Sequence, residues 1–181
     1  MAKQQGKGRG ARTARASRRP LKLGVTIAGV LVVAAVVGWF AYRAAADLPG
    51  EKFLDQGNEH IQTASDPHVA YNSDPPTSGP HLPYIAPWGV HTRPIPLELQ
   101  VHNLEDGGVV VQYNCTCPEI VDKLRAIVGK YDKHVILAPY PGMKSRIALT
   151  AWTRLDRFED LDEKRVVRFI EAYRGIDHHK R

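Results

Sequence analysis

The chain has 181 residues and a formal net charge of +6, and its length allows one domain of ordinary size together with an additional segment. The positive charge is unevenly distributed: nine of the 25 Lys and Arg residues lie at or before Arg43, whereas all 19 Asp and Glu residues follow it. The part after Arg43 therefore carries a small excess of negative charge. The basic composition does not indicate a nucleic-acid-binding protein.

Residues 1–42 have the pattern of a membrane anchor. Residues 1–22 hold eight of the basic residues and no acidic one, and residues 23–42, LGVTIAGVLVVAAVVGWFAY, carry no charge. An apolar helix of this length spans about 30 Å of hydrocarbon, and Trp39 and Tyr42 suit the interface at its far end. We therefore expect a basic cytoplasmic tail at 1–22, a transmembrane helix at 23–42 and, by the positive-inside rule, an extracytoplasmic C-terminal part.

The lipid bilayer is thus the first expected partner, and the expected localisation is the cell membrane, in a single pass. A cleaved signal peptide is the alternative, because Ala44–Ala46 resembles a cleavage site. The apolar run is longer than the usual core of about 7–15 residues in a signal peptide, which favours an uncleaved anchor. All eight His and both Cys residues follow the anchor, in a compartment where cysteines are commonly oxidised or bound to metal.

The part after the anchor divides by composition into a stalk or linker at 43–64, an extracytoplasmic domain at 65–176 and a tail at 177–181. Within the domain, residues 71–96 contain seven prolines, which exclude a helix interior or a central strand. Aromatic residues among them indicate a loop that packs onto the domain. In its first part, YNSDPPTSGPH, turn-forming side chains and prolines predict a stiff segment that presents His81 at a fixed place.

Regular structure is expected after residue 96. LELQVHN, at 97–103, alternates apolar and polar residues and predicts a strand, which the EDGG turn would join to a strand at 109–113 as a hairpin. The remaining expected elements are an amphipathic helix at 118–130, strands at 134–138 and 146–152 joined by a PYPG turn, and a last helix that begins with an Asp160–Glu163 capping box and ends at Gly175. This order predicts an α+β domain with a mainly antiparallel sheet and two packed helices.

Four stretches after the membrane helix, YNSDPPTSGPH, HNLEDGGVVVQY, APYPGM and IALTAW, together resemble the bacterial family known as domain of unknown function 3105. The resemblance covers residues 65–175 and implies a membrane-anchored extracytoplasmic domain, without a known activity. The family is expected to carry a histidine after the Leu-Glu pair, as in an LEHGG motif, where this chain has Asp106. If that position serves a metal, aspartate either offers a harder oxygen ligand or removes the contact.

Cys115 and Cys117 lie between the expected strand at 109–113 and the expected helix at 118–130. Residues at i and i+2 of extended backbone point the same way, and thiolates are soft ligands suited to Cu(I) or zinc. A cysteine at a helix N-terminus also favours a reactive thiolate. Three interpretations therefore stay open for this pair: a metal site, a redox pair or a purely structural pair.

A metal site results if the proline-rich loop folds over the expected hairpin. His81 and His102 then converge near Cys115 and Cys117, and two imidazoles and two thiolates complete a tetrahedral site for one copper or zinc ion. For each histidine the alternative is an ordinary hydrogen bond within a rigid loop. The further candidate ligands are Met143, Asp106 and His91.

The metal-binding hypothesis describes a protein for storage, delivery or sensing of copper or zinc outside the membrane. One alternative is a thiol–disulfide protein that uses Cys115 and Cys117, and another is a scaffold that binds an envelope protein without chemistry of its own. A hydrolase triad of Ser73 or Ser78 with His81 and Asp74 lacks the surrounding nucleophile-elbow pattern. No catalytic residue is therefore assigned from the sequence, and a binding role is favoured over an enzymatic one.

Overall fold

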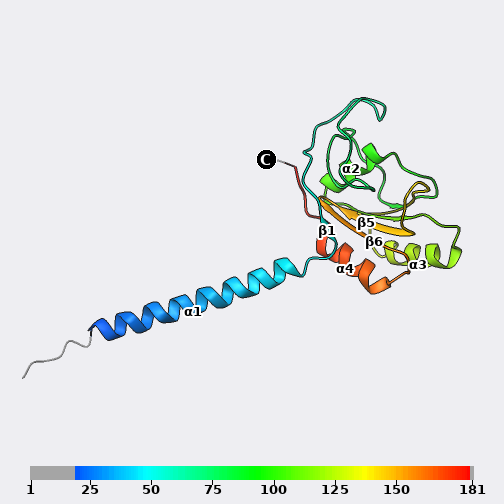
Figure 1. Ribbon diagram of the computed structural model, residues 1–181. Helices are drawn as coiled ribbons and strands as arrows, with labels where there is room; N and C mark the ends of the chain where they lie inside the picture. Colours follow the sequence, from blue (N-terminus) through cyan, green and yellow to red (C-terminus); the bar gives the residue numbers. More distant parts are fainter. Residues whose placement is uncertain (1–18, 180–181) are drawn as a thin grey trace, which may run out of the picture. The chain divides into compact units, whose positions relative to one another are not determined.

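The computed structural model describes residues 19–179, which divide into two compact units between Asp47 and Leu48. The first unit is one helix, α1 (Arg19–Ala46), which includes the apolar run expected to anchor the chain (Figure 1). Within the described part of the chain, no helix is both long and apolar enough to cross a membrane. The anchor at 23–42 stays a prediction, and most of the basic tail at 1–22 lies outside the described residues.

The second unit is an α+β domain built on a six-stranded mixed sheet (Figure 1). The sheet order is β1-β6-β5-β3-β4-β2, so that β3 lies between β5 and β4. β3 pairs in parallel with β4 and antiparallel with β5. The strands are β1 (Glu51–Lys52), β2 (Gly89–Val90), β3 (Val109–Tyr113), β4 (Val135–Pro139), β5 (Ile147–Ala151) and β6 (Arg154–Phe158).

Helices cover both faces of the sheet. Helices α3 (Pro118–Val128) and α4 (Glu163–Tyr173) pack on one face, and α2 (Leu97–Glu105) packs on the other together with the proline-rich loop. Because successive side chains of a strand point to opposite faces, Val109 and Val111 of β3 enter the core under α3 and α4, whereas Val110 enters the core under α2. The expected two packed helices are therefore α3 and α4, and α2 is an addition that builds the opposite layer.

The segment at 97–103 is part of helix α2, so the expected strand there is wrong. Its apolar residues fit the period of a strand and also that of a helix, since Leu97, Val101 and Leu104 recur at the spacing of one helix face. Val101 and Leu104 are buried against the sheet, and this nonlocal packing selects the helical period. The hairpin expected between 97–103 and 109–113 is consequently absent, because α2 leads into β3 through the Gly107 turn.

The strands at 109–113, 135–139 and 147–151 lie within a residue of their expected places, but their pairing differs. The PYPG turn does not close a hairpin, because β4 and β5 flank β3 on opposite sides. The sheet is mixed instead of mainly antiparallel, since β2–β4 and β3–β4 are parallel pairs. Helix α4 is capped by Asp162, whose carboxylate accepts the Arg165 backbone N–H at 3.1 Å, so the expected Asp160–Glu163 capping box is also wrong.

Candidate metal centre

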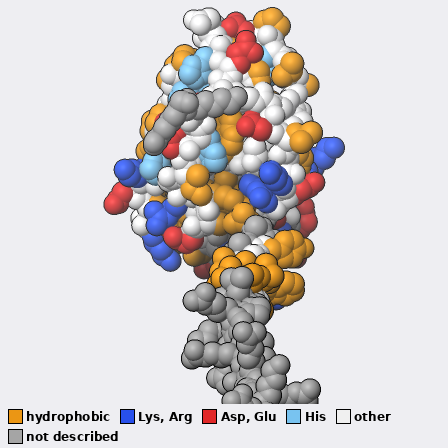
Figure 2. All heavy atoms as spheres, turned by 90° about the vertical axis from the view of Figure 1, so that its left-hand side faces the viewer, with side chains coloured by type: hydrophobic (Ala, Val, Ile, Leu, Met, Phe, Trp, Pro, Cys, Tyr) orange, Lys and Arg blue, Asp and Glu red, His pale blue; other side chains and the backbone are white. Residues whose placement is uncertain are grey.

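Three histidines and one glutamate gather beside the N-terminal end of β3, on the α2 side of the sheet. One potential ligand atom from each of His60, His81, His102 and Glu105 lies within 4.8 Å of the others. The His60 and His81 rings are 5.0 Å apart, and both lie within 5.3 Å of the His102 ring. Histidine side chains reach the surface at several places on the face drawn in Figure 2. This group could hold a metal ion, since imidazole and carboxylate are both common ligands.

Helix α2 supplies two of the four side chains from its last turn. His102 and Glu105 stand at i and i+3, a spacing that puts two side chains on the same helix face. The same i, i+3 spacing, in the reverse order Glu-x-x-His, carries metal ligands in di-metal helix bundles. Asp106 follows as the C-cap residue, with its Oδ1 atom 3.8 Å from His102 Nε2. The helix therefore ends with a row of ligand-type side chains.

The other two side chains come from extended segments that lie side by side. His60 and His81 form a parallel bridge, in which the Ile61 N–H donates to the His81 carbonyl at 2.8 Å and the His81 N–H donates to the Glu59 carbonyl at 2.9 Å. The YNSDPPTSGPH loop holds this register, since Thr77, Ser78 and His81 are fully buried. The expectation of a stiff loop that fixes His81 agrees with this packing.

Two further hydrogen bonds hold the same loop, one within it and one to a neighbouring segment. The Tyr71 hydroxyl donates to the Pro80 carbonyl at 2.6 Å, and the Ser78 hydroxyl accepts the Gln56 backbone N–H at 3.0 Å. Burial raises the pKa of Tyr71, with a smaller contribution from Glu98, so its hydroxyl remains a donor at neutral pH. The loop is thus held at two points before His81.

The hydrogen bonds of His81 define which of its ring atoms faces the centre. Its Nδ1 atom lies 2.7 Å from the Gly79 carbonyl, which only accepts, so Nδ1 carries a proton. Its Nε2 atom lies 3.0 Å from Glu105 Oε2, and both side chains are fully buried. Two lone pairs cannot face each other at this distance without a proton or a cation between them. A proton or a metal ion must therefore lie between His81 and Glu105.

Burial lowers the pKa of His81, because a charged imidazolium loses its hydration in the interior. The Gly79 carbonyl and Glu105 oppose this effect only in part. A second proton on His81 is therefore disfavoured relative to the free side chain. A neutral imidazole with a free Nε2 lone pair is the form that binds a metal ion.

His102 repeats the arrangement of His81. Its Nδ1 atom donates to the Leu82 carbonyl at 2.8 Å, which leaves Nε2 directed toward the cluster. Glu105 is held in turn by Asn58, whose Nδ2 atom donates to Oε1 at 2.6 Å and leaves Oε2 for the histidines. Metal-binding histidines are commonly oriented by such a bond from the other ring nitrogen. Three of the four side chains thus have the kind of supporting hydrogen bond that is common around metal sites.

The C-terminal segment at 175–179 also reaches this centre. The His178 backbone N–H donates to the Glu105 carbonyl at 2.9 Å, and the Gly175 N–H donates to the Gly107 carbonyl at 2.7 Å. Gly107 has a φ of +78°, and a Cβ atom there would lie 2.7 Å from the Ile176 backbone. Only glycine therefore lets the C-terminal segment pass so close to α2. His179 comes within 3.5 Å of Glu105 Oε2 as a result.

The two cysteines lie at the other end of β3. Cys115 and Cys117 form a disulfide with each other, and neither belongs to a group of ligand-type side chains within the described residues. β3 has five residues and spans roughly 16 Å, which separates residues before Gly108 from residues after Tyr113. The structure therefore does not bring the two imidazoles and the two thiolates together, and His81 and His102 lie instead with His60 and Glu105.

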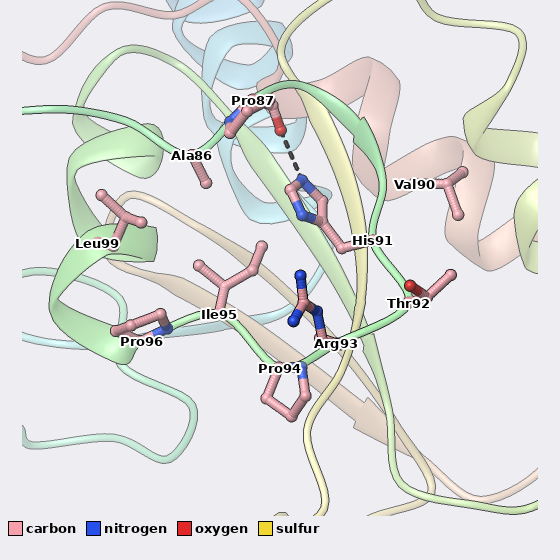
Figure 3. A pocket seen from close by; sticks show the side chains of 10 residues that line it. All are labelled: Ala86, Pro87, Val90, His91, Thr92, Arg93, Pro94, Ile95, Pro96 and Leu99. Carbon is pink, nitrogen blue, oxygen red and sulfur yellow. Dashed lines mark hydrogen bonds between the residues drawn. The ribbon is translucent and has the colours of Figure 1, made fainter.

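The remaining candidates fall into two groups. Asp106 borders the cluster, and its Oδ1 atom is 3.6 Å from His179 Nε2. Met143 is buried in a separate apolar cluster with Ala148 and Leu155. His91 lines a surface pocket of about 440 Å³, where its Nε2 atom donates to the Pro87 carbonyl at 2.7 Å (Figure 3). Neither Met143 nor His91 belongs to the four-residue group.

Sequence reasoning missed His60 and Glu105. His60 lies in a polar segment interpreted as a linker, and no local pattern marks it as a partner of His81. Glu105 was assigned to the EDGG turn. Had the helical period of residues 97–105 been preferred, the His102-x-x-Glu105 spacing would have identified the glutamate as a ligand candidate.

Together these features define a small α+β domain with a buried histidine–carboxylate centre. Residues 62–180 match the family profile described as protein of unknown function (DUF3105), and the chain belongs to this family. The matched range includes His81, His102 and Glu105 and begins just after His60. No curated protein and no solved structure shows significant similarity to the chain.

Proposed function

We propose that this protein binds one divalent transition-metal ion through His60, His81, His102 and Glu105. The observation that carries the proposal is the fully buried contact between His81 Nε2 and Glu105 Oε2 at 3.0 Å, with the opposite ring nitrogen already committed to the Gly79 carbonyl. This geometry needs a proton or a metal ion between the two atoms. His102 aims a second Nε2 atom into the same space, so a metal ion satisfies more groups than one proton does.

The ligand set narrows the class of ion. Thiolates and a thioether would favour Cu(I), but Cys115 and Cys117 are joined as a disulfide and Met143 packs elsewhere. Three imidazoles and one carboxylate suit Zn²⁺ and Cu²⁺, as well as other divalent ions of the first transition row. One carboxylate leaves a single net positive charge on the filled site. The proposal thus keeps zinc and copper, with copper in its divalent state.

The same ligand set favours binding over catalysis. Four protein ligands fill the tetrahedral coordination of zinc, whereas catalytic zinc sites keep one position for water or substrate. The His60 side chain is 46% exposed, so the ion is not sealed in the interior. A site with four protein ligands and one solvent-exposed ligand fits storage, delivery or sensing of a metal. A scaffold for an envelope protein is the alternative if no metal binds.

We further propose that this domain lies outside the cytoplasm on a membrane anchor at 23–42. The support is the charge asymmetry around the apolar run, with eight basic residues before it and no acidic one. Gly10→Cys in intact cells should resist a membrane-impermeant thiol reagent, whereas Ser65→Cys should react. The native cysteines form a disulfide and should give no background. The reverse labelling pattern would contradict this orientation.

Metal titration of the purified full-length protein tests the binding proposal. The metal-free protein should take up one Zn²⁺ or Cu²⁺ ion per chain at neutral pH, measured by calorimetry and by metal analysis after gel filtration. His102→Ala should weaken binding strongly, because it removes one imidazole ligand. His91→Ala is the matched control, since His91 lies at the pocket of Figure 3. If the wild type binds none of the divalent ions tested, the scaffold interpretation takes the place of the metal site.

A further inference from the structure

A second group of ligand-type side chains adjoins the metal centre. Potential ligand atoms of His102, Asp106 and His179 lie within 4.8 Å of one another. His179 Nε2 is 3.6 Å from Asp106 Oδ1, and His102 Nε2 is 3.8 Å from the same oxygen atom. These are the separations that a shared ion can close with small side-chain movements, since bonds of about 2.1 Å put neighbouring ligands roughly 3 to 4 Å apart.

His179 is oriented as a ligand although it lies in the C-terminal tail. Its Nδ1 atom is 2.7 Å from Asp177 Oδ1, and this carboxylate also accepts the His179 backbone N–H at 2.9 Å. Its Nε2 atom then faces two carboxylates, 3.5 Å from Glu105 Oε2 and 3.6 Å from Asp106 Oδ1. His81, His102 and His179 therefore share one device, in which Nδ1 is bound to an oxygen and Nε2 faces the cluster. A solvated tail needs no such arrangement.

The two groups share His102, and His102 has only one lone pair to offer. Because its Nδ1 atom donates to the Leu82 carbonyl, Nε2 is its single ligand atom and can bind one ion at a time. Two ions cannot both use His102. The two groups are therefore alternative positions for one ion, which exchange as His102 turns from one set of partners to the other.

The two positions differ in exposure. The side chains of Asp106 and His179 are 30% and 42% exposed, whereas those of His81 and Glu105 are fully buried, and His60, at 46%, is the inner side chain with comparable exposure. Glu105 Oε2 lies 3.5 Å from His179 Nε2 and 3.0 Å from His81 Nε2, so one carboxylate oxygen reaches both positions. An ion held by Asp106 and His179 can thus pass to the buried histidines without leaving its ligands all at once.

We propose that His102, Asp106 and His179 form an outer metal site, through which a divalent transition-metal ion exchanges with the inner site of His60, His81, His102 and Glu105. This inference rests on the proposed function, because it requires that the inner site binds metal. It predicts a kinetic role for His179. An intermediate position lowers the barrier for uptake and for release alike and leaves the final affinity unchanged.

The test measures Co²⁺ uptake and release by stopped-flow absorbance on the full-length protein, with release started by excess chelator. His179→Ala should slow uptake and release by the same factor. We expect about tenfold, the lower end of the effect typical for mutation of residues that support a metal site. The equilibrium affinity and the stoichiometry of one ion per chain should not change. Asp106→Asn should also slow uptake. His91→Ala is the control histidine, and circular dichroism checks that each variant is folded.

Several results would overturn the outer site. Unchanged rates in His179→Ala would mean that the ion passes directly by the exposed His60 side. Faster release with lower affinity would make His179 a permanent ligand of the bound ion. Two Co²⁺ ions per wild-type chain would make the centre dinuclear. These three results leave the inner site intact, whereas a wild type that binds no Co²⁺ overturns the proposed function together with the outer site.

Discussion

The two ends of β3 carry the residues that a reader of the sequence would first connect with metal chemistry, and the structure treats them differently. At the N-terminal end, His102 and Glu105 converge with His60 and His81 from distant segments. At the C-terminal end, Cys115 and Cys117 pair with each other over a separation of two residues. Two cysteines close together in sequence can bond to each other without the rest of the fold. A site built from several segments has its geometry set by the whole fold.

Among changes that test this difference between the two ends of β3, removal of the Glu105 carboxylate should have the largest effect on metal binding. In Glu105→Gln the anionic oxygen that faces His81 becomes neutral, while the side chain keeps its size. We expect metal affinity to fall by more than about 100-fold, because supporting residues alone typically account for 10–100-fold. Calorimetric titration with Zn²⁺ measures the loss. An affinity within a few-fold of the wild type would show that Glu105 is not a ligand.

Removal of the metal itself should have the next largest effect. An ion that binds only the folded state stabilises it by about 2.7 kcal/mol at a free concentration one hundred times the Kd. Thermal unfolding of the full-length protein, with added Zn²⁺ and with chelator, should show this difference. The Cys115→Ser, Cys117→Ser double variant should gain the same increment. Equal melting temperatures with and without metal in the wild type would contradict binding at the buried site.

Asn58→Ala should have an intermediate effect, because Asn58 orients Glu105 without reaching the ion. Its Nδ2 atom donates to Glu105 Oε1 at 2.6 Å, and the variant leaves this oxygen without that donor. We expect about a tenfold loss of Zn²⁺ affinity, at the lower end of the range for supporting residues. Gln62→Ala, an exposed change nearby in the chain, serves as the control. A loss as large as that of Glu105→Gln would assign Asn58 a more direct role.

The cysteines should have the smallest effect on metal binding. Cys115→Ser and Cys117→Ser lie beyond the far end of β3, and we expect Zn²⁺ affinities within about twofold of the wild type. Stability should change by less than the roughly 3 kcal/mol of a 15-residue loop, because this disulfide closes a much shorter one. Zn²⁺ titration and urea unfolding measure the two quantities. A strong loss of Zn²⁺ affinity would instead support the cysteine thiolates as ligands, as expected from the sequence.

Much of one layer of the fold could be predicted from local pattern. The helix at 118–128 has a clear apolar face, and the strands at 109–113, 135–139 and 147–151 have continuous apolar runs typical of buried strands. Their pairing could not be predicted locally. β4 and β5 are close in sequence, yet each pairs with β3. The sequence of the turn between them does not determine which strand lies beside each.

The site was half predictable for the same physical reason. The stiffness of the YNSDPPTSGPH loop and the donor atoms of His81 and His102 are local properties, and both residues do come together. The partnership of His60 with His81 depends on a single bridge between remote segments. The choice between strand and helix at 97–105 depends on the burial of Val101 and Leu104. Neither contact leaves a signature in a short window of sequence.

Gly107 shows that a residue can be needed for the metal centre without offering a ligand atom. It has no side chain that could bind a metal, but its positive φ and the absence of a Cβ atom let Ile176 pass beside α2 and bring the tail to Glu105. Any other residue would strain the turn and push the tail outward. In a deep mutational scan selected for metal exchange, Gly107 should therefore tolerate as few substitutions as His102, and intolerance in such a scan should not be equated with ligation.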